Sequence, residues 1–254
     1  MENIEGIFEN YRTEFDEINN KRNRIDIARK DVTIFSKRLI FFLHRDMPNQ
    51  NKFKEAQKKL EQIHQKIQII ADEISTDEEC FWRYSFTISW GIEEYIEAVL
   101  FYYYLKDNKL KIKIRKKFKN NLIFPKDYLG GLADLTGELM RYSTDAVAHG
   151  DTQTPIKVLE AIQQIYSLFI SLPRSAKVDM NKLSVMETSM KKIENICFKI
   201  QLAQEEFPKV ILDETLPQII PQKAKILTKK RKNNYDPQFK QSKEQKEQKE
   251  SKEN

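Results

Sequence analysis

The sequence predicts an all-α protein, and three observations support this prediction. Apolar residues recur every three or four positions over most of the chain, which is the spacing of one face of an α-helix. No segment alternates apolar and polar residues for long enough to predict a β-strand. The 254 residues include only 6 Gly and 8 Pro, so few positions interrupt a helix and long helices are expected.

The first half of the chain predicts three long helices. Residues 4–42 keep helical apolar spacing, which predicts one helix of about forty residues that ends before Pro48. A second helix is expected over residues 53–74, where the apolar positions again recur at steps of three and four. The Ser75-x-x-Glu78 pattern is typical of a capping box, so a third helix is expected to begin there and to continue to about residue 105.

The second half predicts three further helices and one basic segment. Residues 106–120 are a basic helix or loop, which Pro125 separates from a helix that starts near Asp127. That helix is expected to end at His149-Gly150, where a cation and a glycine are typical of a C-terminus. Thr154-Pro155 predicts the start of the next helix, with proline at its first position, and the last helix spans about 183–200.

Together these patterns predict an elongated bundle of about seven helices. Several helices carry apolar stripes that are longer than a compact monomer covers easily. Intrachain core packing is the ordinary explanation of any one stripe. The number and length of the stripes favour additional burial against other subunits.

All of the net charge of the chain lies in its C-terminal tail. Residues 221–254 contain 11 of the 44 Lys and Arg residues and 5 of the 38 Asp and Glu residues, so the other 220 residues are neutral overall. The tail repeats Lys-Glu-Gln and has no apolar period, which predicts disorder. Its basic tetrad, residues 229–232, is either a nuclear address or part of a solubilising tail. We expect a helical domain over residues 1–208 and a disordered tail over 209–254.

The sequence predicts neither a secretion signal nor a membrane-spanning segment. The first 15 residues lack the apolar core of a secretion signal, and the apolar run 98–105 is far shorter than the roughly 20 residues of a membrane span. Cys80 and Cys197 lie in helical patterns, as expected of reduced thiols. We therefore expect a cytoplasmic and nuclear protein without a membrane partner.

Two apolar helices carry acidic residues at positions that can bring them together. Glu94 and Glu97 share one face of the helix around residues 90–101, and Asp134 and Glu138 share one face of the next acidic helix. Three glycines in the second helix would let another backbone approach closely. If the helices pack together, up to four carboxylates converge and require a cation. Oxygen ligands favour Mg²⁺ or Mn²⁺ over zinc, and these ions support phosphodiester hydrolysis.

Other interpretations of these acids stay open from spacing alone. A Glu-x-x-Glu pair is commonly exposed or paired with Lys or Arg. An iron carboxylate bundle needs Glu-x-x-His on two helices, which the sequence lacks. A helical nucleotide pyrophosphatase also begins with the acidic pattern of residues 93–97, but its usual Glu-x-x-Asp partner is missing downstream. His44, His64 and His149 lie in no recognisable catalytic or ligand motif.

Residues 127–141, Asp-Tyr-Leu-Gly-Gly-Leu-Ala-Asp-Leu-Thr-Gly-Glu-Leu-Met-Arg, closely resemble a signature of the translin-associated factor X (TRAX) branch of the translin family. The similarity covers roughly residues 15–208. Four shorter segments are also similar to the family: residues 36–45, 94–99, 149–155 and 191–197.

The resemblance implies a translin-like all-α bundle that assembles with translin into a hollow hetero-octamer. Such complexes cut single-stranded RNA with Mg²⁺, including passenger-strand fragments in RNA silencing and fragments from tRNA maturation, and DNA is a further ligand. The resemblance places the catalytic acids at Glu94, Glu97 and Asp134, with Glu138 also in the metal environment. Translin lacks both glutamates, so their presence implies the catalytic endoribonuclease subunit. Glu93 lies about 100° around the helix from Glu94 and is expected to matter little.

RNA-binding residues are harder to assign from the sequence. The basic segment between the acidic helices could hold phosphates through Lys113, Arg115, Lys116 and Lys117, although a charge run is commonly a solvated face. Arg83 falls near the segment that binds nucleic acid in translin. The aromatic residues of 81–86 could stack on bases, but we expect them in the core. Two non-catalytic functions also stay open, a translin-binding scaffold that holds RNA or protein and a coiled-coil adaptor.

Overall fold

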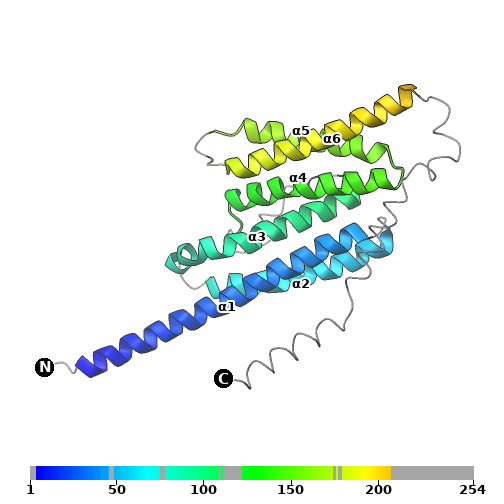
Figure 1. The fold of residues 1–254 in the computed structure, drawn as a ribbon. Helices are drawn as coiled ribbons and strands as arrows, with labels where there is room; N and C mark the ends of the chain where they lie inside the picture. The colour runs from blue at the N-terminus through cyan, green and yellow to red at the C-terminus, as the bar shows by residue number, and fades with distance from the viewer. Residues whose placement is uncertain are drawn as a thin grey trace, which may run out of the picture. The chain divides into compact units, whose positions relative to one another are not determined.

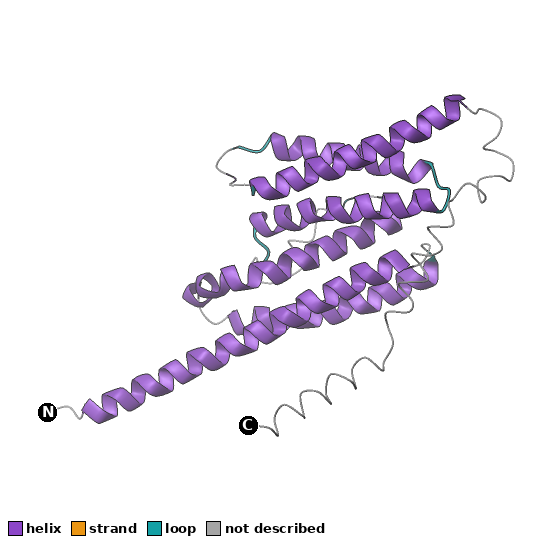
Figure 2. Cartoon of the chain, viewed as in Figure 1, coloured by secondary structure: helices purple, strands orange, loops and turns teal. Residues whose placement is uncertain are grey.

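The computed structural model describes residues 4–45, 49–74, 78–108, 110, 122–173, 176 and 179–206. Six helices occupy these ranges: α1 (Ile4–Arg45), α2 (Gln50–Ile74), α3 (Glu78–Asp107), α4 (Pro125–Ala148), α5 (Gln153–Ile170) and α6 (Met180–Glu206). No strand occurs in the same ranges, which confirms the all-α prediction (Figure 2). The chain divides into two units, Met1–Lys199 and Ile200–Asn254.

Several sequence-based predictions fall outside the described residues. They include the side chains of Cys80 and Phe81, Ser75 of the expected capping box, and the tail over 209–254. The basic segment 106–120 is described only at residues 106–108 and 110, so the seventh element stays a prediction. The expected RNA-binding residues of that segment lie outside the described part of the chain: Lys113, Arg115, Lys116 and Lys117.

The start of α4 is held by a buried acid. Pro125 occupies the first turn, where its missing N–H is not needed. The carboxylate of Asp127 accepts the backbone N–H of Phe124 at 3.0 Å and the hydroxyl of Ser89 from α3. Burial raises the pKa of Asp127, and these two hydrogen bonds act in the opposite direction. The same acid therefore caps α4 and ties it to α3.

The connection from α4 to α5 differs from the predicted boundary. Gly150 has a φ of 86°, which only glycine adopts readily and which ends α4 as expected. The next helix begins at Gln153, so Pro155 lies in its first turn rather than at its first position. The carboxylate of Asp151 accepts the N–H groups of Gln153 and Thr154 at 2.9 and 3.0 Å. Asp151 therefore supplies the capping interaction that the sequence had assigned to Thr154.

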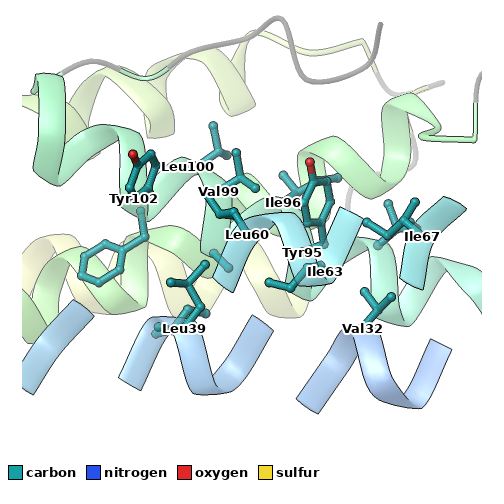
Figure 3. Packing of buried hydrophobic residues seen from close by; sticks show 14 of the residues in the cluster. Val32, Leu39, Leu60, Ile63, Ile67, Tyr95, Ile96, Val99, Leu100 and Tyr102 are labelled. Carbon is teal, nitrogen blue, oxygen red and sulfur yellow. The ribbon is translucent and has the colours of Figure 1, made fainter. Parts of the chain in front are cut away.

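In the first unit, α3 is the central helix of the core. It packs against α1, α2 and α4, and α5 packs on the other side of α4 (Figure 1). Figure 3 shows the main cluster, in which side chains from α1 and α2 meet α3. The labelled members are Val32, Leu39, Leu60, Ile63, Ile67, Tyr95, Ile96, Val99, Leu100 and Tyr102. A smaller cluster joins α4, α5 and α6 through Ala133, Ile165, Phe169 and Met186.

The first turns of α1 carry apolar side chains that the unit does not bury. Phe8 and Phe15 are 71% and 67% exposed, whereas the buried residues of α1 begin at Ile25. Exposed apolar stripes of this kind are typical of subunit interfaces. No helix in the described ranges is long and apolar enough to span a membrane.

Candidate active site

Two glycines of α4 let its backbone approach α3 closely. A Cβ atom on Gly131 would lie 2.6 Å from the backbone oxygen of Glu93 and 2.8 Å from the Cβ of Ile96. A Cβ on Gly130 would lie 2.6 Å from the carboxyl carbon of Glu93. Gly137, in contrast, has no neighbouring atom within 4 Å of such a Cβ. The predicted close approach of another backbone is confirmed at Gly131, whereas Gly130 lies against the Glu93 side chain and the prediction is wrong for Gly137.

A cleft of about 490 Å³ opens beside this helix contact. It is formed mainly by α3, α4 and the start of α6, with Phe169 of α5 at one side. The acids Glu93, Glu94, Asp134 and Asp179 line it, together with Lys126 and Lys182. The cleft therefore combines acidic and basic side chains from three helices.

Lys182 of α6 bridges two of the acids. Its Nζ atom donates to Glu93 Oε2 at 2.6 Å, to Asp134 Oδ2 at 2.8 Å and to the backbone oxygen of Gly130 at 3.3 Å. Burial acts to lower the pKa of Lys182, but the bonds to Asp134 and Glu93 outweigh it and raise the pKa. Glu93 therefore lies in the same cleft as Asp134. Although Glu93 lies about 100° around the helix from Glu94, Lys182 of α6 joins it to Asp134. That Glu93 matters little for function stays a prediction.

A second lysine holds Glu94. Lys37 Nζ of α1 lies 2.9 Å from Glu94 Oε1. This hydrogen bond raises the pKa of Lys37, and the negative charges of Glu97 and Asp134 act in the same direction. The ammonium group of Lys37 therefore responds to three of the four predicted acids.

Glu97 is the most buried of the four, with only 9% of its surface exposed. Burial and the charges of Asp134, Glu94 and Glu138 raise its pKa to about 8, while Lys182 opposes the shift. Glu97 therefore lies within electrostatic range of the other three predicted carboxylates. It links the two acidic pairs that the spacing had placed on separate helices.

Glu138 is held by a histidine that the sequence did not assign. His44 Nε2 of α1 lies 2.5 Å from Glu138 Oε2, and Arg141 Nη1 lies 3.8 Å from the same oxygen. The hydrogen bond with His44 lowers the pKa of Glu138 despite its burial. The His44 ring also stacks near Phe101, with centroids 4.7 Å apart, and its Nδ1 atom is buried without a hydrogen-bond partner. Glu138 is thus fixed as an ionised carboxylate.

The donor chemistry of this site fits a hard divalent cation. The set consists of four carboxylates and no thiol, and carboxylate oxygens are the ligand type that Mg²⁺ prefers. In the described ranges, however, no three His, Cys, Asp or Glu side chains are grouped closely enough to hold a metal ion as they stand. Lys37 and Lys182 take up the ligand oxygens of Glu94 and Asp134 instead. A cation would therefore have to displace these two ammonium groups.

Aromatic side chains on α3 are distributed differently from the prediction. Tyr84 is buried, as expected of a core residue, but Trp82 and Phe86 are 60% and 71% exposed. Trp90, one turn further along, is 65% exposed and lines the cleft with Phe86. The prediction that Trp82 and Phe86 pack in the core is therefore wrong. Arg83 lies exposed on the same helix.

Comparison with known proteins identifies the family. The Translin family model matches residues 20–204. The chain belongs to the translin family. Its relatives include translin-associated protein X of Pongo abelii, 31% identical over 238 residues, with 81% of each chain covered. The translin-associated protein X homolog of Schizosaccharomyces pombe is 28% identical over 228 residues, covering 84% of this chain and 96% of the relative.

Solved structures support the translin-like fold. The structure described as apo-NeC3PO has a TM-score of 0.61 and 23% identity, and covers 75% of this chain and 95% of that one. The structure of an AfC3PO–duplex RNA complex has a TM-score of 0.63 and 20% identity, with 78% and 97% covered. These similarities confirm the predicted translin-like helical fold.

Proposed function

We propose that this chain is the catalytic subunit of a translin–TRAX-type complex, a Mg²⁺-dependent endoribonuclease that hydrolyses single-stranded RNA. The observation that supports this proposal is the convergence of Glu94, Glu97, Asp134 and Glu138 on one site, where burial and repulsion raise the pKa of Glu97 to about 8. Carboxylates gathered in this way weaken the fold unless a cation or a proton joins them. A ligand-binding role accounts for an arrangement that stability alone disfavours.

Each acid would have a distinct task. Glu94, Glu97 and Asp134 would hold Mg²⁺, which supplies an activated water and neutralises charge on the phosphodiester when it is bound. His44 keeps Glu138 ionised beside this set through the 2.5 Å hydrogen bond. Lys182, once released from Asp134, lies in the cleft where a phosphate oxygen would need a cation.

The assembly forms the second half of the proposal. The related chains are named translin-associated protein X, and the exposed apolar side chains at the start of α1 fit burial against a translin partner in a hetero-octamer. One related structure holds duplex RNA, which supports nucleic acid as the ligand here. We propose single-stranded RNA as substrate, passenger-strand or tRNA-processing fragments in particular, and DNA as a further ligand. The protein would act in the cytoplasm and the nucleus.

A non-catalytic scaffold is the alternative, and one observation favours it. Lys37 and Lys182 already neutralise Glu94 and Asp134, as they would in purely structural ion pairs. In that case the acids would tie α1 and α6 to the central helices, and the complex would bind RNA without cutting it.

The deciding experiment uses the full chain co-expressed with translin of the same organism. Single-turnover cleavage of labelled single-stranded RNA is measured across a Mg²⁺ titration, and RNA binding is measured separately. Glu94→Ala, Glu97→Ala and Asp134→Ala should each reduce cleavage by on the order of 100-fold or more, because removing even a supporting group of a metal site costs 10- to 100-fold. Combined substitutions should be non-additive, because the acids act as one unit.

The control variant is Asp145→Ala, which removes an exposed acid from the same helix as Asp134. It should leave cleavage unchanged. Glu138→Ala should be milder than the other three, because His44 holds that acid in the resting site. If a Glu94→Ala, Glu97→Ala double variant still cleaves RNA like the wild type, with a translin shown to be inert, the scaffold function replaces the proposed one.

A further inference from the structure

Two large aromatic side chains lie exposed on one face of α3. Phe86 is 71% and Trp90 is 65% exposed. Their spacing of four residues places the two rings on neighbouring turns of the same helix face. Trp82 extends the stripe by one more turn, with its ring 5.7 Å from that of Phe124. Adjacent exposed aromatic residues of this size are typical of a binding surface.

The position of the two rings connects them to the acidic site. Phe86 and Trp90 both line the cleft that contains Glu94 and Asp134. Trp90 precedes Glu94 by one helical turn, so its ring lies beside the proposed metal-binding carboxylates. A strand that placed a phosphate at these acids would bring its neighbouring bases to the aromatic face.

The charges of the cleft argue for a nucleic acid over a protein helix. Lys126 and Lys182 line the same cleft as the two rings, together with the carboxylates of Glu93, Glu94, Asp134 and Asp179. A phosphate there would meet Lys126 directly, and at the acids it would meet the Mg²⁺ of the proposed function. The core of a protein interface is depleted of charge, and a partner helix lying on the rings would bury Glu93, Glu94 and Asp134 beneath it. Flat rings beside cations are the combination that single-stranded nucleic acids use, with bases on the rings and phosphates on the cations.

We propose that Phe86 and Trp90 form a stacking platform for unpaired bases next to the phosphate that is cleaved, and that this platform selects single-stranded over duplex RNA. A base in a duplex has both faces covered by its neighbours, so it cannot lie on the rings. The inference rests on the proposed function for its substrate. It adds the residues that distinguish an unpaired strand from a paired one.

The test measures binding in the translin complex with EDTA present, so that no RNA is cut. Trp90→Ala should weaken binding of a single-stranded RNA about 10-fold, since one base stack contributes about 1–3 kcal/mol. Phe86→Ala should have a similar effect, and Trp90→Tyr should restore most of the affinity. Binding of duplex RNA should not change. Phe198→Ala is the matched control, because Phe198 is 64% exposed on α6 and outside the cleft.

A second RNA separates stacking from every other effect of the substitutions. A strand of the same length with abasic sites should bind to the wild type about as weakly as the intact strand binds to Trp90→Ala. Trp90→Ala should then cause no additional loss with the abasic strand. If removing the bases and removing the Trp90 ring weaken binding additively, the platform is overturned, because the ring would then contact something other than the base.

The remaining outcomes also decide the inference. Loss of the translin complex in Phe86→Ala and Trp90→Ala, seen by size-exclusion chromatography with light scattering, would show that this face docks a protein. Unchanged single-strand affinity would likewise overturn the platform. Trp90-dependent binding in a complex that never cleaves RNA would sustain the platform and refute the proposed function. If the complex cleaves RNA and Trp90→Ala binds single-stranded RNA as tightly as the wild type, the platform is refuted and the proposed function stands.

Discussion

Replacing Glu97 by glutamine should stabilise the protein, and increasingly so as the pH rises. Glu97 is 9% exposed, and burial together with Asp134, Glu94 and Glu138 raises its pKa from the ordinary value of 4.5 to about 8. The folded protein therefore keeps a proton on Glu97 that the unfolded chain has already released. Stability is lost as the pH rises from about 4.5 to about 8, because the unfolded state ionises first. Glutamine has nearly the same shape and cannot ionise.

The size of the stabilisation by Glu97→Gln follows from the shift in the pKa of Glu97. Each pH unit between the two pKa values corresponds to about 1.4 kcal/mol. The advantage of Glu97→Gln should thus grow by roughly 4 kcal/mol between pH 5 and pH 8, as an order of magnitude. For a domain of this size about 1 kcal/mol changes Tm by roughly 2–4 °C, so the two Tm values should separate by about 10 °C over that range.

The assay is thermal unfolding of wild type and Glu97→Gln from pH 5 to pH 9 in EDTA, as full-length protein with its translin partner. Glu187→Gln is the control, since that acid lies half-exposed in an ion pair with Lys191 and should keep a curve parallel to the wild type. If the Tm values of wild type and Glu97→Gln change with pH in parallel, the reasoning is refuted. Such a result would mean that Glu97 is already ionised and neutralised at neutral pH.

Two further predictions follow from the fold. Gly131→Ala should destabilise the protein by about 1–3 kcal/mol, because the new methyl group meets the backbone of Glu93, whereas Gly137→Ala should be neutral or stabilising by up to about 1 kcal/mol; denaturant unfolding of both variants measures the contrast. Deletion of residues 221–254 should leave folding and RNA cleavage unchanged while altering localisation, because the segment has no apolar period and contains the basic tetrad. Loss of cleavage on deletion would identify the tail as a substrate-binding arm.

Helix positions were predictable because each helix carries its own period. The apolar residues of 53–74 recur at steps of three and four, and α2 is observed over Gln50–Ile74. Boundaries depended on capping contacts that the pattern does not encode. The start of α5 shows this, since Asp151 rather than Thr154 satisfies its first N–H groups. A side chain two residues upstream decided where that helix begins.

The acidic residues were predictable for a related reason. Glu94 with Glu97, and Asp134 with Glu138, are pairs within one helix, so their common faces follow from the helical repeat. The contact between the two helices was signalled by the glycines of α4, of which Gly131 lies against the backbone of α3. Spacing and glycine content therefore suggested that the four acids could converge, and the family resemblance was needed to choose that interpretation.

The cations of the site could not be predicted in the same way. Lys37 and His44 lie on α1, and Lys182 lies on α6, far from the acids in sequence. Their pairing depends on how the helices pack, which no local spacing reveals. The ion pair of Glu93 with Lys182 was missed for the same reason, because the position of Glu93 was inferred relative to Glu94 alone. One signal was available for Lys37 and His44, since both fall in a segment, residues 36–45, that resembles the family.

The ion pairs of the resting site explain which acid a metal ion would affect most. Lys37 neutralises Glu94, Lys182 neutralises Asp134, and His44 holds Glu138. In the described part of the chain Glu97 alone among the four has no such partner, and a proton takes that place at neutral pH. A divalent cation that entered the site would make the ionised form of Glu97 favourable and release its proton. The metal would therefore exchange with two ammonium groups and one proton, so that two positive charges replace three beside the carboxylates.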